Sequence, residues 1–147
     1  MSKINIWGHF TWVFLHTIIE KLKNESLSIL PDLVKFLNTI CYNLPCPTCA
    51  SHAKLFLTNK NLSSMNKEQL KETFWIFHNA VNRRLKKEMY NKENLTKYKD
   101  YNLNHTFNNF MKVFKTTNLP LSADTFHRKS TITKIHKWYL NNRVHFD

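Results

Sequence analysis

The amino-acid sequence predicts an all-α protein, a four-helix bundle with an additional short helix and a basic C-terminal extension. Apolar residues recur three and four positions apart along most of the chain, which is the period of an amphipathic helix. The 147 residues include one glycine and four prolines, and alternating strand-like patterns are weak. Because 42% of the residues are hydrophobic and 14% are aromatic, the chain can bury the core of one globular domain.

The first two expected helices have clear apolar faces. The first runs from about residue 9 to residue 23. Its buried stripe consists of residues at four-residue steps: Phe10, Phe14, Ile18 and Leu22. The second begins at Pro31, since proline is favourable in the first turn of a helix. It ends before Pro45, because the residue that precedes a proline is disfavoured in helical geometry.

Two further helices are expected after this proline. One opens at the segment from Cys46 to Cys49 and continues to about residue 58. The next starts near Asn66, which forms a capping-box pattern with Gln69, and runs to about residue 88.

The chain changes character after about residue 116, where a proline-containing break precedes a last basic stretch. Before the break, a shorter helix is expected over residues 93–101 or over residues 105–115. After it, residues 131–143 could form a helix with four apolar residues on one side: Ile132, Ile135, Trp138 and Tyr139. We expect residues 1–116 to form the functional domain and residues 117–147 to be an extension of unknown role. Its basic stretch is expected to be a solvated helix, or else a surface for an acidic partner or nucleic acid.

Charge and glycine content narrow the classes of function. With 22 Lys and Arg against 10 Asp and Glu, the formal net charge is +12, which attracts anionic partners. The basic residues are spread along the chain without a dense run, so nucleic acid is not the expected partner. Because Gly8 is the single glycine, the G-x-G-x-x-G, P-loop and G-x-S-x-G patterns cannot occur.

The N-terminus lacks the basic start and apolar run of a secretory signal, and no apolar stretch is long enough to span a membrane. We therefore expect a soluble, cytoplasmic protein with no membrane contact. In that reducing compartment a C-x-x-C pair is more often catalytic or metal-binding than a structural disulfide.

Cys46 and Cys49 form such a pair at the expected N-terminus of a helix, where backbone N–H groups and the helix dipole favour a thiolate. A dithiol–disulfide cycle is one interpretation, half of a zinc site is a second, and two buried unreactive cysteines are a third. The further zinc ligands on offer, Cys41, His52 and His78, do not have the spacing of a zinc finger or ribbon. We favour redox chemistry without a metal. Helices rather than strands flank the pair, so a thioredoxin-like fold is not expected, and an aromatic-rich bundle suits a flat cofactor.

Three sequence blocks carry a more specific signal. Residues 7–16 read WGHFTWVFLH, residues 44–53 read LPCPTCASHA, and residues 78–87 read HNAVNRRLKK. The first is similar to a W-G-x-x-x-W-x-x-L-H opening, the second to a viral form of a C-x-x-C redox motif, and the third to H-N-x-V-N-x-x-L-x-K. In this order and spacing the blocks resemble the Erv/ALR-type FAD-linked sulfhydryl oxidases, in particular the short forms encoded by large DNA viruses.

The resemblance implies a small helical bundle, usually a homodimer, with the FAD isoalloxazine beside the C-x-x-C disulfide and the adenine held between helices. The resemblance covers about residues 7–101, and we expect the FAD-binding oxidase domain to span residues 1–116. Two electrons would pass from a substrate dithiol into the Cys46–Cys49 disulfide, on to FAD and then to molecular oxygen, which is released as hydrogen peroxide. Cys46 would face the substrate and Cys49 the flavin. If the chain is viral, the host cytoplasm or the virion is the expected location.

The resemblance also implies a set of FAD contacts. The residues carried over from the motifs are Gly8, Trp12, His16, His52, His78, Asn79, Val81, Asn82 and Lys87. Outside this family, aromatic and apolar residues at helical spacing would be core residues, and lone histidines are more often structural. Lys87, with Arg83 or Lys86, would neutralise the FAD pyrophosphate, because no glycine loop can do so.

The chain departs from the family pattern in two respects. The structural disulfide of cellular members is absent, since Trp75 and Lys92 occupy its positions, so Trp75 with Met89 or Tyr90 must hold the following segment. A second, distal cysteine pair is also missing. The left-over Cys41 is expected to be buried. We therefore expect a thiol-containing substrate protein or a thioredoxin-like shuttle to reduce the redox pair directly. The alternative to an oxidase is a non-enzymatic, basic helical zinc-binding module that interacts with nucleic acid.

Overall fold

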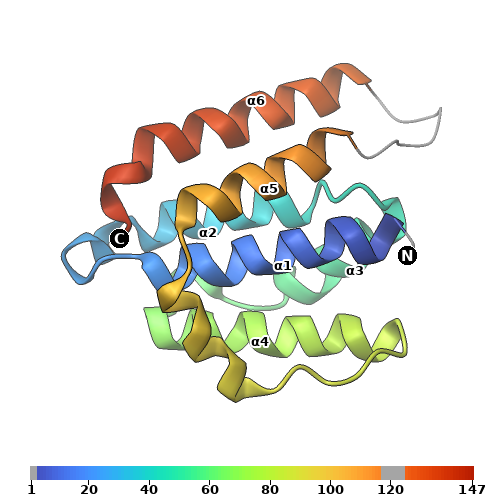
Figure 1. Ribbon diagram of the computed structural model, residues 1–147, viewed down its shortest axis with the longest axis horizontal. Helices are drawn as coiled ribbons and strands as arrows, with labels where there is room; N and C mark the ends of the chain where they lie inside the picture. Colours follow the sequence, from blue (N-terminus) through green and yellow to red (C-terminus); the bar gives the residue numbers. More distant parts are fainter. Residues whose placement is uncertain (1–2, 117–124) are drawn as a thin grey trace.

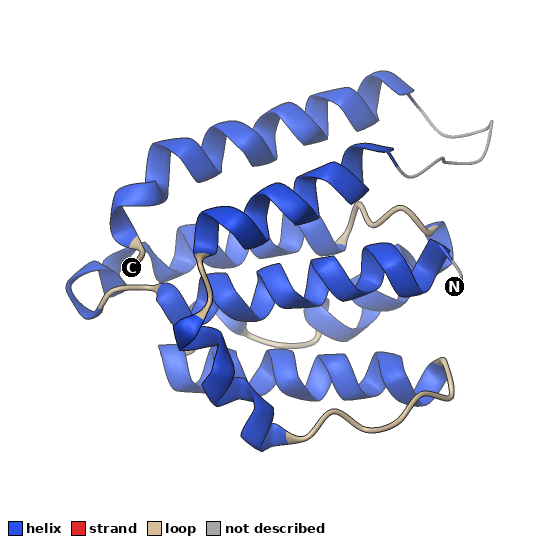
Figure 2. Cartoon of the chain, in the orientation of Figure 1, coloured by secondary structure: helices blue, strands red, loops and turns tan. Residues whose placement is uncertain are grey.

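The computed structural model describes residues 3–116 and 125–147, and the regular secondary structure within them is helical (Figures 1 and 2). The α-helices there are α1 (Lys3–Lys21), α2 (Leu30–Cys41), α3 (Pro47–Thr58), α4 (Lys67–Arg84), α5 (Leu103–Thr116) and α6 (Thr125–Asn142). Short 3₁₀ segments occur between and after them: η1 (Asn24–Ile29), η2 (Leu62–Ser64), η3 (Lys92–Asp100) and η4 (Arg143–His145). The predicted all-α class is confirmed.

Local hydrogen bonds mark both ends of α4. The predicted capping box is present, with the Gln69 N–H donating to Asn66 Oδ1 at 2.8 Å and the Asn66 N–H donating to Gln69 Oε1 at 2.9 Å. The helix ends before the predicted residue 88, because Lys86 adopts left-handed geometry with φ 58°. The Lys87 N–H then turns back and donates to the Asn82 carbonyl at 2.8 Å, which caps the helix.

Helix α1 lies at the centre of the core and contacts α4, α5 and η3. It begins at residue 3, earlier than predicted. Phe14 and Ile18 are fully buried on it, and the Phe14 ring stacks on Phe110 of α5 with ring centroids 5.0 Å apart. Phe10 was expected in the same buried stripe but is only half-buried, because it faces a cavity instead of the core.

Both predicted alternatives for the segment after α4 exist, as η3 and α5. Helix α6 then packs across α2 and α5, as Figure 1 shows. Trp138 stacks on Phe36 of α2 with centroids 4.1 Å apart, and Tyr139 stacks on Phe107 of α5 at 3.7 Å. The one-sided apolar face predicted for the last helix is confirmed, although the helix begins at residue 125 and not at 131.

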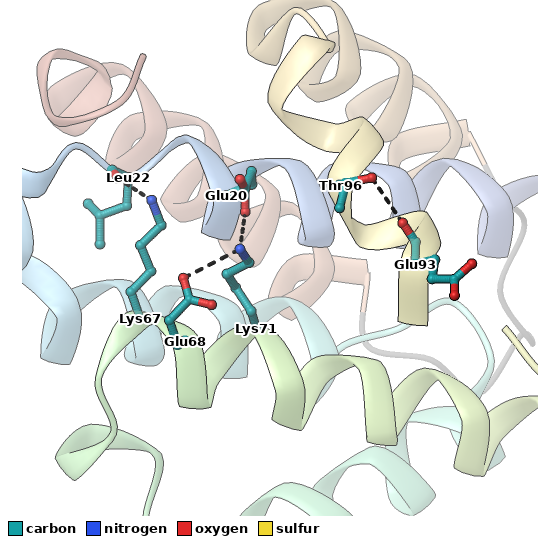
Figure 3. A network of polar contacts seen from close by, with 7 residues as sticks. All are labelled: Glu20, Leu22, Lys67, Glu68, Lys71, Glu93 and Thr96. Carbon is teal, nitrogen blue, oxygen red and sulfur yellow. Dashed lines mark hydrogen bonds and ion pairs between the residues drawn. The ribbon is translucent and has the colours of Figure 1, made fainter. Parts of the chain in front are cut away.

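Polar contacts fasten the C-terminal end of α1 to the first turns of α4 (Figure 3). Lys71 Nζ forms an ion pair with Glu20 Oε2 at 2.7 Å, and Lys67 Nζ donates to the Leu22 carbonyl at 2.8 Å. Among the described helices, none combines the length and the apolar character needed to cross a membrane.

Candidate active site

A cavity of about 870 Å³ lies beside α1 and α4, within the size range of ligand-binding pockets. One wall is the first half of α1, and a second is the last turns of α4. The segment from Tyr90 to Asn109, which includes η3, contributes further lining residues. Cys41, Leu44 and Cys49 line it from the α2–α3 region.

Of the two cysteines in the C-x-x-C pair, one lines the cavity and the other does not. Cys46 is the N-cap of α3, and its Sγ accepts a hydrogen bond from the Cys49 N–H at 3.2 Å. Cys49 is buried, with 7% of its surface exposed, and lines the cavity. Cys46 is half-buried and does not line it. The assignment of Cys49 to a cofactor and of Cys46 to a substrate stays a prediction, and the observation that bears on it is that only Cys49 lines the cavity.

An arginine that the sequence motifs did not single out lies against Cys49. Burial raises the pKa of the Cys49 thiol, and its hydrogen bond with Cys46 raises it further, whereas the Arg84 guanidinium opposes both. Arg84 lines the cavity, and its Nη2 is buried without a hydrogen-bond partner among the described residues. Arg84 follows Val81 by three positions, so helical periodicity alone could have placed it on the cavity face.

Four rings form a stack at one side of the cavity. Trp12 and His78 are almost parallel, with an interplanar angle of 6° and centroids 4.1 Å apart. Tyr90 stacks on His78 at 4.5 Å, and His16 lies behind, with its Nε2 3.0 Å from His78 Nδ1. Burial is the main cause that lowers the pKa of each histidine to about 3. Both are therefore neutral at pH 7, and one donates the shared proton while the other accepts it.

The neutral histidine pair predicts acid sensitivity. Each folded pKa, about 3, lies below the ordinary value of 6.5, so the unfolded chain binds more protons between these values and the stability falls as the pH falls. Between about pH 7.5 and pH 5.5 we expect each histidine to cost about 1.4 kcal/mol of unfolding free energy. Urea unfolding at both pH values measures this.

The control for the histidine pair is an exposed histidine. His78→Phe keeps a ring in the stack but removes the ionisable group, so its stability should depend less on pH. His136→Gln, on the exposed side of α6, should retain the wild-type dependence. Equal pH dependence in the wild type and in His78→Phe would contradict the assignment.

Two asparagines of α4 hold the segment that closes the cavity. Asn79 exchanges two hydrogen bonds with the Tyr90 backbone, at 2.6 and 3.1 Å, and Asn82 Nδ2 donates to the Glu88 carbonyl at 3.1 Å. Trp75 Nε1 also donates to the Tyr90 carbonyl, at 2.7 Å. Tyr90 is thus the residue that Trp75 holds in place of a disulfide, whereas Met89 is 56% exposed.

The structure brings most of the predicted site residues together. The residues that line the cavity are Gly8, Trp12, Cys49, His78, Val81, Asn82 and Lys87. His16 and Asn79 are buried directly behind this lining and contact His78 and Tyr90. His52 lies on the exposed side of α3 and does not line the cavity. Arg83 and Lys86 are likewise exposed and outside the lining.

Sequence reasoning missed the contribution of η3. Lys97 and Tyr98 line the cavity, and the Lys97 ammonium lies 5.5 and 5.4 Å from the ring centroids of Tyr90 and Tyr98. Burial and a short hydrogen bond to the Tyr90 hydroxyl raise the pKa of Tyr98. The lysines and tyrosines that alternate in this segment were a weak signal for a binding site. Nothing in the local sequence indicates that η3 packs against the stacked rings of the cavity.

Comparison with known proteins identifies the family of this chain. The model of the Erv1/Alr family matches residues 9–102. The chain is 32% identical over 93 residues to protein 347L of Invertebrate iridescent virus 6, covering 58% of this chain and 84% of that protein. It is 33% identical over 91 residues to the FAD-linked sulfhydryl oxidase of African swine fever virus, covering 56% and 71%.

A plant protein shows the same similarity over a smaller share of its length. The FAD-linked sulfhydryl oxidase ERV1 of Arabidopsis thaliana is 33% identical over 81 residues, which is 54% of this chain and 42% of the plant protein. No solved structure gives a significant match. The resemblance seen in the three sequence blocks is confirmed, and the chain belongs to the Erv1/Alr family.

Proposed function

We propose that this protein is an FAD-dependent thiol oxidase that forms disulfide bonds in substrate proteins. Electrons pass from a dithiol through the Cys46–Cys49 pair and FAD to molecular oxygen, which becomes hydrogen peroxide. The observation that carries the proposal is the position of Cys49, which faces a large cavity walled by stacked rings and lysines. Family members named FAD-linked sulfhydryl oxidases support the same activity.

The residues of the cavity fit FAD. The Trp12–His78–Tyr90 stack suits the flat rings of a dinucleotide, and neutral histidines add no charge there. Lys87 and Lys97 supply positive charge for a pyrophosphate. FAD held by these residues would supply a two-electron acceptor to the cavity that Cys49 lines.

The protein residues carry the thiol–disulfide chemistry. A substrate thiolate attacks Cys46 Sγ, the Cys46–Cys49 bond breaks, and its electron pair leaves on Cys49 as a thiolate. A second substrate thiolate attacks the substrate sulfur of the mixed disulfide, so the substrate disulfide forms and Cys46 leaves as a thiolate. The Cys49 N–H donates to Cys46 Sγ and holds this sulfur at the start of α3. The two thiolates would re-form the Cys46–Cys49 bond by giving up two electrons through Cys49 to the acceptor that FAD would supply.

An external partner supplies the electrons. The prediction that Cys41 is buried is confirmed, because it has 0% of its surface exposed and burial raises its pKa to about 12. Cys41 is therefore unsuited to exchange, and a thiol-containing substrate protein or a thioredoxin-like shuttle reduces Cys46 directly. We further propose a homodimer in the cytoplasm, or in the virion or host cytoplasm if the chain is viral, and an oxidase domain over residues 1–116.

The purified protein tests the activity directly. We expect a yellow protein that consumes oxygen and releases hydrogen peroxide when a small dithiol is added. The zinc-binding alternative predicts a colourless protein that reconstitutes with metal and not with FAD. Among the described residues, no three His, Cys, Asp or Glu side chains gather in a group that could hold a metal ion.

A further inference from the structure

Helix α6 reaches the segment that leads into the redox pair. At its first turn, Arg128 Nη1 donates a short hydrogen bond to the carbonyl of Asn43, three residues before Cys46. Arg128 Nη2 donates to the Phe114 carbonyl at 2.9 Å, and the guanidinium carbon lies 3.8 Å from the Phe114 ring centroid. Figure 1 shows the start of α6 at the same end of the molecule as the α2–α3 connection.

Asn43 is held from several directions at once. Its N–H donates to the Ile40 carbonyl at 3.1 Å, and its Nδ2 donates to the Thr39 carbonyl at 2.7 Å. Its Oδ1 lies 3.0 Å from His127 Nε2. With its own carbonyl bound to Arg128, Asn43 becomes a fixed point from which the chain turns into α3.

This fixed point is close enough to Cys46 to affect it. Only Leu44 and Pro45 separate Asn43 from Cys46, and Leu44 lines the cavity while Pro45 is buried. Cys46 Sγ accepts the Cys49 N–H only while Cys46 stays at the N-cap of α3. Movement of Asn43 would therefore be transmitted over a short, stiff connection to the reactive sulfur.

We propose that Arg128 is a positioning residue for Cys46, which makes the C-terminal extension a working part of the redox site. The family match ends at residue 102, so Arg128 lies outside the matched region, whereas Asn43 and Cys46 lie inside it. Burial lowers the pKa of Arg128 to about 10, so the side chain stays charged at pH 7 and its bonds to the two carbonyls are charge-assisted. The inference rests on the proposed role of Cys46 as the attacked sulfur.

Arg143 provides a matched control at the other end of the extension. Its Nε donates to Asn104 Oδ1 at 2.8 Å and its Nη1 to the Phe146 carbonyl at 2.9 Å. It thus anchors the C-terminal end of α6 with bonds of the same kind, and none of these contacts reaches the α2–α3 connection. If Arg128 has a purely structural role, its replacement and that of Arg143 should change the reactivity of Cys46 equally.

The test measures the alkylation rate of reduced Cys46 by iodoacetamide, in full-length Cys49→Ser protein that carries Arg128→Leu, Arg128→Lys or Arg143→Leu. We expect Arg128→Leu to slow alkylation at pH 7 about three- to tenfold, because Cys46 is then held less firmly at the N-cap, where its sulfur accepts the Cys49 N–H. Arg128→Lys should slow alkylation less, because lysine keeps the charge but lacks the planar guanidinium that donates to both carbonyls through separate nitrogens. Arg143→Leu should stay within about twofold, although both leucine variants lower the melting temperature.

An unchanged or faster rate in Arg128→Leu, or an equal slowing in Arg143→Leu, would overturn the proposal. If Arg128→Leu does not fold, the alkylation rates of Arg128→Lys and Arg143→Leu are compared instead, and a smaller difference between them is expected. Alkylation needs neither flavin nor oxygen, so a protein that fails as an oxidase would still report on Arg128.

Discussion

Cys46→Ser and Cys49→Ser are each expected to lower dithiol oxidation by at least about a thousandfold while the protein still binds FAD. Serine cannot form or break the disulfide through which both electrons pass. The rings and lysines proposed to hold the cofactor are unchanged, so the flavin spectrum of the folded protein should persist. Oxygen consumption with a small dithiol measures the loss, and oxidase activity that survives either change would contradict the electron path.

The two serine variants should differ in what they trap. In Cys49→Ser, Cys46 remains at the half-buried N-cap and should form mixed disulfides with a dithiol partner that cannot be resolved internally. In Cys46→Ser, the remaining thiol of the pair, Cys49, is buried against the cavity and should trap little. Cys41→Ala is the control, because this buried cysteine has no part in exchange and its replacement should leave the activity within about twofold. Equal trapping through both cysteines would contradict their assigned roles.

Features that depend on neighbouring residues could be predicted from the sequence. The capping box of Asn66 and Gln69 and the helix that opens at Cys46 follow from interactions within one turn. The end of α4 could not be predicted, because Lys86 adopts left-handed geometry that is usually left to glycine or asparagine.

The parts of the site that come from distant segments were harder to predict from the sequence. The motif match placed Trp12 and His78 in one site, and the structure brings their rings 4.1 Å apart. It did not identify Tyr98, which reaches the cavity through the tertiary packing of η3 against α1. The contacts of α6 with the rest of the chain could not be predicted either. The basic composition of this helix predicts a solvated surface, whereas Arg128 donates to two backbone carbonyls.

Arg84→Met is expected to make Cys49 a poorer thiolate and the enzyme slower by about tenfold to a hundredfold. Burial already raises the pKa of Cys49, and the Arg84 guanidinium is the cation that opposes this effect. The electron pair released when the disulfide opens must reside on Cys49, in surroundings where an uncompensated charge is costly. Without Arg84 the pKa of Cys49 should rise further, so less thiolate forms near neutral pH.

The pH profile of Cys49 separates this electrostatic role from a structural one. In full-length Cys46→Ser protein, the ultraviolet absorbance of the thiolate should appear at higher pH when Arg84→Met is added, and Arg84→Lys should restore part of the shift. Arg83→Met removes the same charge from the adjacent, exposed position on α4 and should leave the profile almost unchanged, because solvent screens that arginine. A structural defect alone would lower the melting temperature without moving the titration. If Arg84→Met and Arg83→Met titrate alike, Arg84 is not the counter-charge of Cys49, and the unpaired Nη2 in the cavity must serve another group.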